Sequence, residues 1–230
     1  MKLWGICAMT CLLAVVFRAA ASDGYTASTN NDQRLIRWQH EIIYAGPATD
    51  VTISPDHQSV AWVEEHLAGF SEILDEPTPV NSGVLFFAHA GDKPTEIKRP
   101  TTSRGWQLPS EDPSINVVYR PENFQWDSGS RFLYYTTTPW ITRRMLWQLR
   151  ISDAQPRAIV PLTEFRLLKK HHGADWVEAY ETNYEHQDFS LGLCIRDWTT
   201  TYVYAPEEMA AETYVRPERR GCITKEWPKH

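Results

Sequence analysis

Two copies of a strand-turn-strand pattern constrain the fold of this chain more than any other feature. In residues 51–62 an apolar segment ends, the turn Ser54-Pro55-Asp56 follows, and a second apolar segment begins. Residues 124–134 repeat this order, with aspartate, serine and glycine in the turn. These residue types favour chain reversal, so each copy predicts two antiparallel strands joined by a turn. The repetition predicts sheets that are built as successive similar units.

A second pair of segments follows the same logic. Residues 85–97 and 147–159 each contain a strand, an acidic turn and another strand, and Pro94 in the first matches Pro156 in the second. Two such hairpins make a four-stranded antiparallel unit, whose faces are buried only against neighbouring units. We therefore predict an all-β fold of small or irregular propeller-like antiparallel sheets. A β-sandwich with coincidental hairpins is the alternative.

Short runs of β-branched and aromatic residues support this fold class. Most of them have the length of strands rather than of ordinary helices. The runs are Ile42–Tyr44, Val60–Val63, Val84–Ala88, Ile115–Tyr119, Phe132–Thr137, Leu146–Ile151 and Thr199–Tyr204. A helical pattern is limited to residues 62–74, 165–170 and 206–213, and loops are the alternative there.

The repeats also resemble a known family. Ile53–Asp56 with the following Val60–Trp62, and Gly129–Tyr134 with the following Leu146–Pro156, look like the repeats of TolB-type, WD40-like β-propellers of the bacterial envelope. The resemblance covers residues 51–163 and implies propeller blades. The second copy departs from the family's usual Ser-Pro-Asp turn. The copies are also spaced more widely than the about 40–50 residues of common blades.

The first 21 residues have the organisation of a secretory signal peptide. Lys2 supplies a positive start, residues 3–17 form an uncharged and mostly apolar run, and three alanines end at Ala21. The run is shorter than the roughly 20 residues of a membrane-spanning helix, so we predict no stable membrane insertion. The sequence thus predicts a periplasmic or secreted protein.

The remaining chain is predicted to form one domain that is preceded by a short tether. Residues 22–34 are rich in serine, threonine, asparagine and aspartate, which predicts a flexible tether. Residues 35–230 then form a single β-rich, propeller-like domain. The whole sequence has 23 Lys+Arg against 29 Asp+Glu, a formal charge of −6. This acidic balance argues against nucleic-acid binding.

Loss of the signal peptide would leave two of the four cysteines, Cys194 and Cys222. In an oxidising compartment two cysteines most simply form one disulfide, and two unpaired thiols are the alternative. No motif for catalysis or cofactor binding occurs: G-x-S-x-G, the P-loop, H-E-x-x-H and the dinucleotide fingerprint are all absent. We therefore predict a non-enzymatic protein without a cofactor.

One segment offers metal-ligand chemistry. His171 and His172 are followed by Asp175, and imidazole and carboxylate groups are suitable ligands for zinc. Adjacent histidines on a strand face opposite ways, however, so we predict no metal site there. A metal-dependent hydrolase at His171 and His172 remains an alternative function.

Six of the ten tryptophans fall into two groups by their position. Those inside the repeats are predicted to pack in the core or between sheets, namely Trp62, Trp126 and Trp147. Those beside proline, glycine or polar residues are predicted to belong to a binding surface, because aromatic side chains anchor interfaces. These are Trp106, Trp140 and Trp227.

A long acidic and apolar connection, residues 63–82, interrupts the first repeat. It is either a decorated loop or an interaction lid, and Phe70 and Glu72 within it are candidate binding residues. The leading hypothesis is an exported, non-catalytic module that binds another envelope or secreted protein. Neutralisation of that protein is a special case. A glycan-binding module is the alternative if the loop tryptophans converge.

Overall fold

The fold is all-β, as the sequence predicts. The computed structural model describes residues 23–72, 76–99, 102–103, 106–107, 110–113, 118–138, 144–162, 164–171, 174–189, 192–207 and 211–215. Within these ranges there is no α-helix. The helical interpretation of residues 62–74 and 165–170 is therefore wrong, since residues 62–71 lie in a strand and residues 165–170 lie in another. Of residues 206–213, the described part comprises a turn and the start of a strand.

The strands form antiparallel sheets in which consecutive strands are also spatial neighbours. The first sheet contains β1 (Tyr25–Asn30), β2 (Gln33–Trp38) and β3 (Glu41–Gly46). The second contains β4 (Ala48–Ile53), β5 (Ser59–Ser71), β6 (Thr78–His89) and β7 (Thr95–Ile97). A small hairpin follows, with β8 (Thr102–Ser103) and β9 (Trp106–Gln107).

Two further four-stranded sheets complete the described fold. The third sheet contains β10 (Val118–Trp126), β11 (Phe132–Thr138), β12 (Arg144–Arg150) and β13 (Gln155–Leu162). The fourth contains β14 (Glu164–His171), β15 (Ala174–Phe189), β16 (Gly192–Tyr204) and β17 (Ala211–Val215). None of these sheets closes into a barrel.

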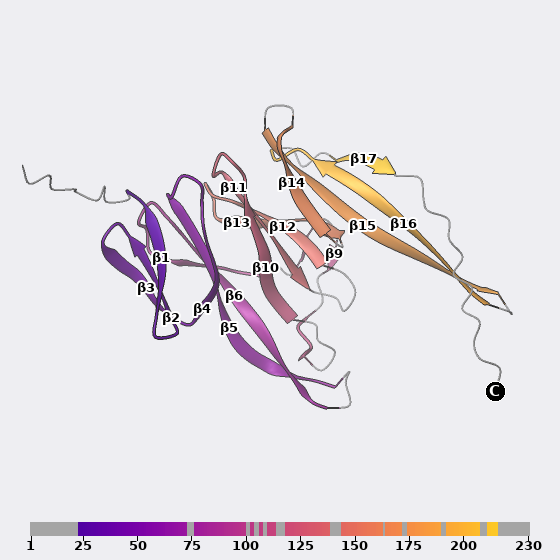
Figure 1. The fold of residues 1–230 in the computed structure, drawn as a ribbon, viewed down its shortest axis with the longest axis horizontal. Helices are drawn as coiled ribbons and strands as arrows, with labels where there is room; N and C mark the ends of the chain where they lie inside the picture. The colour runs from indigo at the N-terminus through magenta and orange to yellow at the C-terminus, as the bar shows by residue number, and fades with distance from the viewer. Residues whose placement is uncertain are drawn as a thin grey trace, which may run out of the picture.

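The four sheets follow one another in chain order across the molecule, with the first at one end and the fourth at the other (Figure 1). A separate buried apolar cluster lies between each sheet and the next. Strand β5 contributes side chains to two of these clusters. Its Trp62 packs with the first sheet, whereas the flanking Ala61 and Val63 pack with the third. Because alternate side chains point to opposite faces, the inner sheets are buried on both sides.

The two sequence repeats form matching turns. In the β4–β5 turn, the amide of Ser54 donates to the carbonyl of Ser59 at 2.9 Å. In the β10–β11 turn, the amide of Asp127 donates to the carbonyl of Phe132 at 3.0 Å. Ser54 Oγ and Asp127 Oδ1 accept the reciprocal amides, at 2.9 and 2.7 Å. The predicted turn chemistry is thus confirmed, with serine and aspartate performing the same role.

Hydrogen bonds also connect these turns from one sheet to the next. The amide of Tyr25, in the first sheet, donates to the carbonyl of His57 at 2.7 Å. The amide of Asp56 donates to Ser130 Oγ, in the β10–β11 turn of the third sheet, at 3.1 Å. The amide of Ser128 donates in turn to Asp175 Oδ2 of the fourth sheet at 2.7 Å. The turns are therefore aligned along one end of the sheets.

The ordered sheets begin earlier in the chain than the composition indicates. Residues 25–30, inside the segment predicted as a tether, form β1 and pair with β2. Tyr25 is fully buried, and its hydroxyl accepts a hydrogen bond from the amide of Gly91 at 3.0 Å. The rest of β1 is largely exposed, because this strand lies at the edge of the first sheet. An exposed edge strand and a loop have similar polar compositions, which explains the difference.

Buried tyrosines make the alkaline titration a test of the sheet packing. Burial raises the pKa of Tyr119 to about 12 and also raises the pKa values of Tyr134 and Tyr135. Tyrosine in an unfolded chain titrates near pH 10. Their stabilising contribution is therefore complete below about pH 10 and is lost as the pH rises through the folded-state values. Tyrosinate absorbance should show these groups ionising only near or above pH 12.

The unfolded protein in urea is the control for this titration, and all of its tyrosines should ionise near pH 10. Circular dichroism must be recorded at each pH to follow the folded state. Ionisation of every tyrosine near pH 10 with a native circular dichroism spectrum would contradict the packing of Tyr135 between the second and third sheets and of Tyr134 between the third and fourth sheets.

Candidate functional site

The connection predicted as a loop or lid is a two-stranded projection of the second sheet. Beyond Glu64, β5 no longer pairs with β4, and before Leu85, β6 does not pair with β7. The two strands continue as a hairpin up to the pair Ser71 and Thr78. We call this projection, residues 65–72 and 76–84, the β5–β6 arm; it extends away from the body of the sheet in Figure 1.

Two large apolar side chains are exposed on this arm. Leu67 is 57% exposed and Phe70 is 52% exposed. A shift in register lies between Leu67 and Gly69, so the strand contains a bulge at Ala68. The extra residue changes the alternation of side chains by one position. Leu67 and Phe70 therefore share one face of the arm although they are three residues apart.

The base of the arm is fixed against the third sheet. Glu65 forms a salt bridge with Arg120 of β10, with an N–O distance of 2.7 Å. Ser82 Oγ donates to Glu111 Oε1 and also lies within hydrogen-bonding distance, 2.9 Å, of the carbonyl oxygen of Tyr119. A two-stranded hairpin is marginally stable by itself, so these contacts explain how the arm can hold a defined orientation.

The tip of the arm is acidic. Glu72 and Glu76 are both exposed, and they lie on either side of the undescribed tip. Thr78 Oγ1 donates to the carbonyl of Glu76 at 3.2 Å, which orders the start of β6. The arm therefore presents an apolar pair next to carboxylates, a combination suited to contact with an apolar and basic surface.

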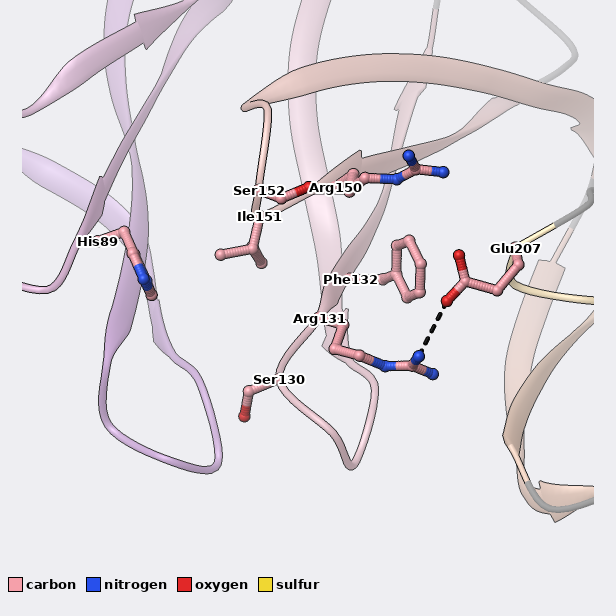
Figure 2. A pocket seen from close by; sticks show the side chains of 8 residues that line it. All are labelled: His89, Ser130, Arg131, Phe132, Arg150, Ile151, Ser152 and Glu207. Carbon is pink, nitrogen blue, oxygen red and sulfur yellow. Dashed lines mark hydrogen bonds and ion pairs between the residues drawn. The ribbon is translucent and has the colours of Figure 1, made fainter.

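A second candidate site lies where the turns of the sheets meet. Its volume is about 400 Å³, and Figure 2 shows the side chains around it. The lining residues come from the second, third and fourth sheets or their adjoining turns and are His89, Ser130, Arg131, Phe132, Arg150, Ile151, Ser152 and Glu207. We call this the turn-end pocket. A neighbouring depression of about 480 Å³ shares three of these residues, so the two form a continuous surface.

Two arginines flank an aromatic ring in the turn-end pocket. The guanidinium carbons of Arg131 and Arg150 lie 5.4 and 6.0 Å from the centre of the Phe132 ring. Arg131 forms a salt bridge with Glu207, with an N–O distance of 2.9 Å (Figure 2). On the facing wall, His89 Nδ1 lies 2.9 Å from Ser59 Oγ. The pocket therefore combines positive charge with an apolar surface.

The predicted binding residues fall into two groups. Phe70 and Glu72 both lie at the exposed end of the β5–β6 arm. The backbone of Trp106 lies in β9, but the position of its side chain is not described. Trp140 and Trp227 lie outside the described residues. A binding role for these three tryptophans stays a prediction.

The tryptophans predicted to pack inside the fold do so. Trp62 and Trp147 are buried in the clusters on either side of the second sheet. Trp126 is partly buried, and its indole nitrogen donates to Thr52 Oγ1 of the second sheet at 2.9 Å. These contacts confirm the prediction of packing between sheets.

The remaining predicted residues lie mostly outside the description. Cys194 belongs to β16, but Cys222 is not described, so the predicted disulfide stays a prediction. His171 ends β14, and His172 is not described. Asp175 is buried and accepts the turn hydrogen bond described above. Among the described side chains, no group of three or more histidines, cysteines, aspartates and glutamates is placed to hold a metal ion.

Comparison with known proteins gives no family for this chain. No protein-family model matches the sequence, and no curated protein is significantly similar to it. In the described part of the chain, no helix has the length and apolar character needed to cross a membrane.

Proposed function

We propose that this protein is an exported, non-catalytic interaction module that binds another envelope or secreted protein through its β5–β6 arm. The observation that carries the proposal is the exposed pair Leu67 and Phe70 on one face of the arm. Large apolar side chains that remain exposed next to each other mark interaction surfaces in soluble proteins. Phenylalanine is moreover enriched at the centres of interfaces.

The charge of the arm specifies the chemistry of the partner. Glu72 and Glu76 flank the tip, and the whole chain has a formal charge of −6. A partner with an apolar depression and a basic rim would match the arm in both respects. Such charge complementarity mainly increases the association rate and the specificity.

The propeller-like architecture is part of the same proposal. Successive antiparallel sheets with repeated turns support a relationship to TolB-type, WD40-like repeats. Stacked sheets are rigid supports, and connecting segments that extend from such supports commonly carry binding residues. Export is proposed from the signal-peptide pattern of residues 1–21.

The proposal predicts selective loss of partner binding when the apolar pair is removed. The double variant Leu67→Ser/Phe70→Ser should reduce the capture of a specific envelope protein by at least about tenfold, because interface hot spots contribute more than 1.4 kcal/mol. The measurement is quantitative mass spectrometry after affinity capture from an envelope extract of the source organism.

Ile42→Ser is the matched control, because Ile42 in the first sheet is also 52% exposed but lies away from the arm. This variant should retain capture of the same protein. Equal capture by the double variant and the wild type, with both folded by circular dichroism, would overturn the role of the arm. Equal losses from the double variant and Ile42→Ser would do the same.

A further inference from the structure

We infer that the turn-end pocket binds a ligand carboxylate between Arg131 and Arg150, with an apolar group of the ligand attached to that carboxylate. This site is separate from the β5–β6 arm and does not depend on the proposed function. It is formed only when the turns of three successive sheets are brought together. Its volume of about 400 Å³ is within the range of small-ligand sites.

Arg150 provides the first argument. Its Nε is buried and makes no hydrogen bond to any residue that the structure describes. Among the described residues, no carboxylate lies within salt-bridge distance of its guanidinium group. A buried donor without an acceptor is unfavourable, and a bound carboxylate could supply acceptor oxygens to this guanidinium.

Glu207 provides the second argument. Its side chain reaches the pocket from the segment after β16 and pairs with Arg131 beside the Phe132 ring (Figure 2). The pocket thus already accommodates one carboxylate of the chain itself. Both side chains of this pair are more than half exposed, so the pair is weak and a ligand can displace it.

The surroundings define the rest of the ligand. Ile151 lines both the turn-end pocket and the adjoining depression, and Phe87, Ala88 and Ala154 continue the lining of that depression. The Phe132 ring provides an apolar surface directly beside the arginines, and these side chains extend the apolar lining on the side of His89 (Figure 2). A ligand with a carboxylate and a compact apolar body fits this arrangement better than inorganic phosphate does.

Isothermal titration calorimetry on the folded, full-length chain would test the inference. The probe is 3-phenylpropionate, and the comparison ligands are 3-phenylpropanol and inorganic phosphate. We expect 3-phenylpropionate to bind at least about tenfold more tightly than either comparison ligand, because only it satisfies both arginine and apolar contacts. A free acid and a peptide carboxyl terminus share this chemistry, so N-acetyl-Leu-Phe is titrated as well. Tighter binding of 3-phenylpropionate would indicate a free acid as the natural ligand, and tighter binding of N-acetyl-Leu-Phe would indicate a peptide carboxyl terminus. Either result supports the site.

Two variants assign the binding to the pocket. Arg150→Gln should weaken binding of 3-phenylpropionate by about tenfold or more, because it removes the unpaired guanidinium. Glu207→Gln should strengthen binding severalfold, because it removes the closer of the two carboxylates that pair with Arg131, the other being Asp127. Arg34→Gln is the control, since it removes an exposed arginine of β2 far from the pocket along the chain.

Three results would overturn the inference. The first is absence of binding to the wild-type protein, and the second is equal binding of 3-phenylpropanol. The third is an effect of Arg34→Gln as large as that of Arg150→Gln. Thermal unfolding of each variant separates a loss of binding from a loss of structure. The exposed position of Glu207 makes Glu207→Gln informative even if Arg150→Gln does not fold.

Discussion

Replacing Trp147 with alanine is expected to lower the free energy of unfolding by about 3–5 kcal/mol, the range for large aromatic residues removed from a core. Trp147 is buried in the cluster between the second and third sheets. Its ring stacks on Tyr135 with a centroid distance of 6.3 Å, and its indole nitrogen donates to Thr137 Oγ1 at 2.8 Å. Urea denaturation followed by circular dichroism would measure the change.

A pair of phenylalanine variants separates packing from hydrogen bonding. Trp62 is as deeply buried as Trp147, but its indole nitrogen has no hydrogen-bond partner in the described part of the chain. Trp62→Phe should therefore lose mainly volume, whereas Trp147→Phe also leaves the buried Thr137 hydroxyl without its donor. We expect Trp147→Phe to cost about 1 kcal/mol more. A change below 1 kcal/mol for Trp147→Ala would contradict the packing of these two sheets.

Replacing Asp127 with alanine is expected to cost about 2–4 kcal/mol, because it leaves two backbone amides without their acceptor. The side chain is buried, and its Oδ1 accepts hydrogen bonds from the amides of Arg131 and Phe132, both at 2.7 Å. The turn that it holds carries Arg131 into the turn-end pocket. Urea denaturation again gives the free energy of unfolding.

Because the two turns are equivalent, Asp127→Ser is the matched comparison for Asp127→Ala. Ser54 accepts one reciprocal amide in the β4–β5 turn, as Asp127 does in the β10–β11 turn. Asp127→Ser should therefore recover part of the stability that Asp127→Ala loses. If serine and alanine at this position were equally destabilising, the two turns would not be equivalent.

The repeats could be predicted from the sequence because each turn is determined by residues that are adjacent in the chain. Pro55, Asp56 and Gly129 favour chain reversal wherever they occur, and the apolar segments around them alternate with the period of a strand. The predicted helical pattern in residues 62–74 has a specific origin. Because of the bulge at Ala68, Leu67 and Phe70 lie on the same face of the strand although they are three residues apart. Residues three apart also share a face in a helix, so the sequence pattern resembles that of a helix.

The candidate sites could be predicted only in part. Phe70 and Glu72 are recognisable because an acidic and apolar segment interrupts a repeat. The turn-end pocket could not be predicted, since Arg131 in the β10–β11 turn, Arg150 at the end of β12 and Glu207 after β16 meet only through the packing of sheets. Arginine and glutamate are common on any protein surface, so their residue types alone do not indicate a pocket. A contact that depends on the arrangement of whole sheets leaves no local pattern in the sequence.

Photo-crosslinking from the β5–β6 arm tests the central claim most directly. A photoreactive amino acid in place of Phe70 would be compared with one in place of Ile42, because the two side chains are equally exposed. In an envelope extract we expect the probe at position 70 to crosslink one protein with a basic surface, and the probe at position 42 not to crosslink it. Crosslinking of the same proteins from both positions, or of none from position 70, would contradict the account.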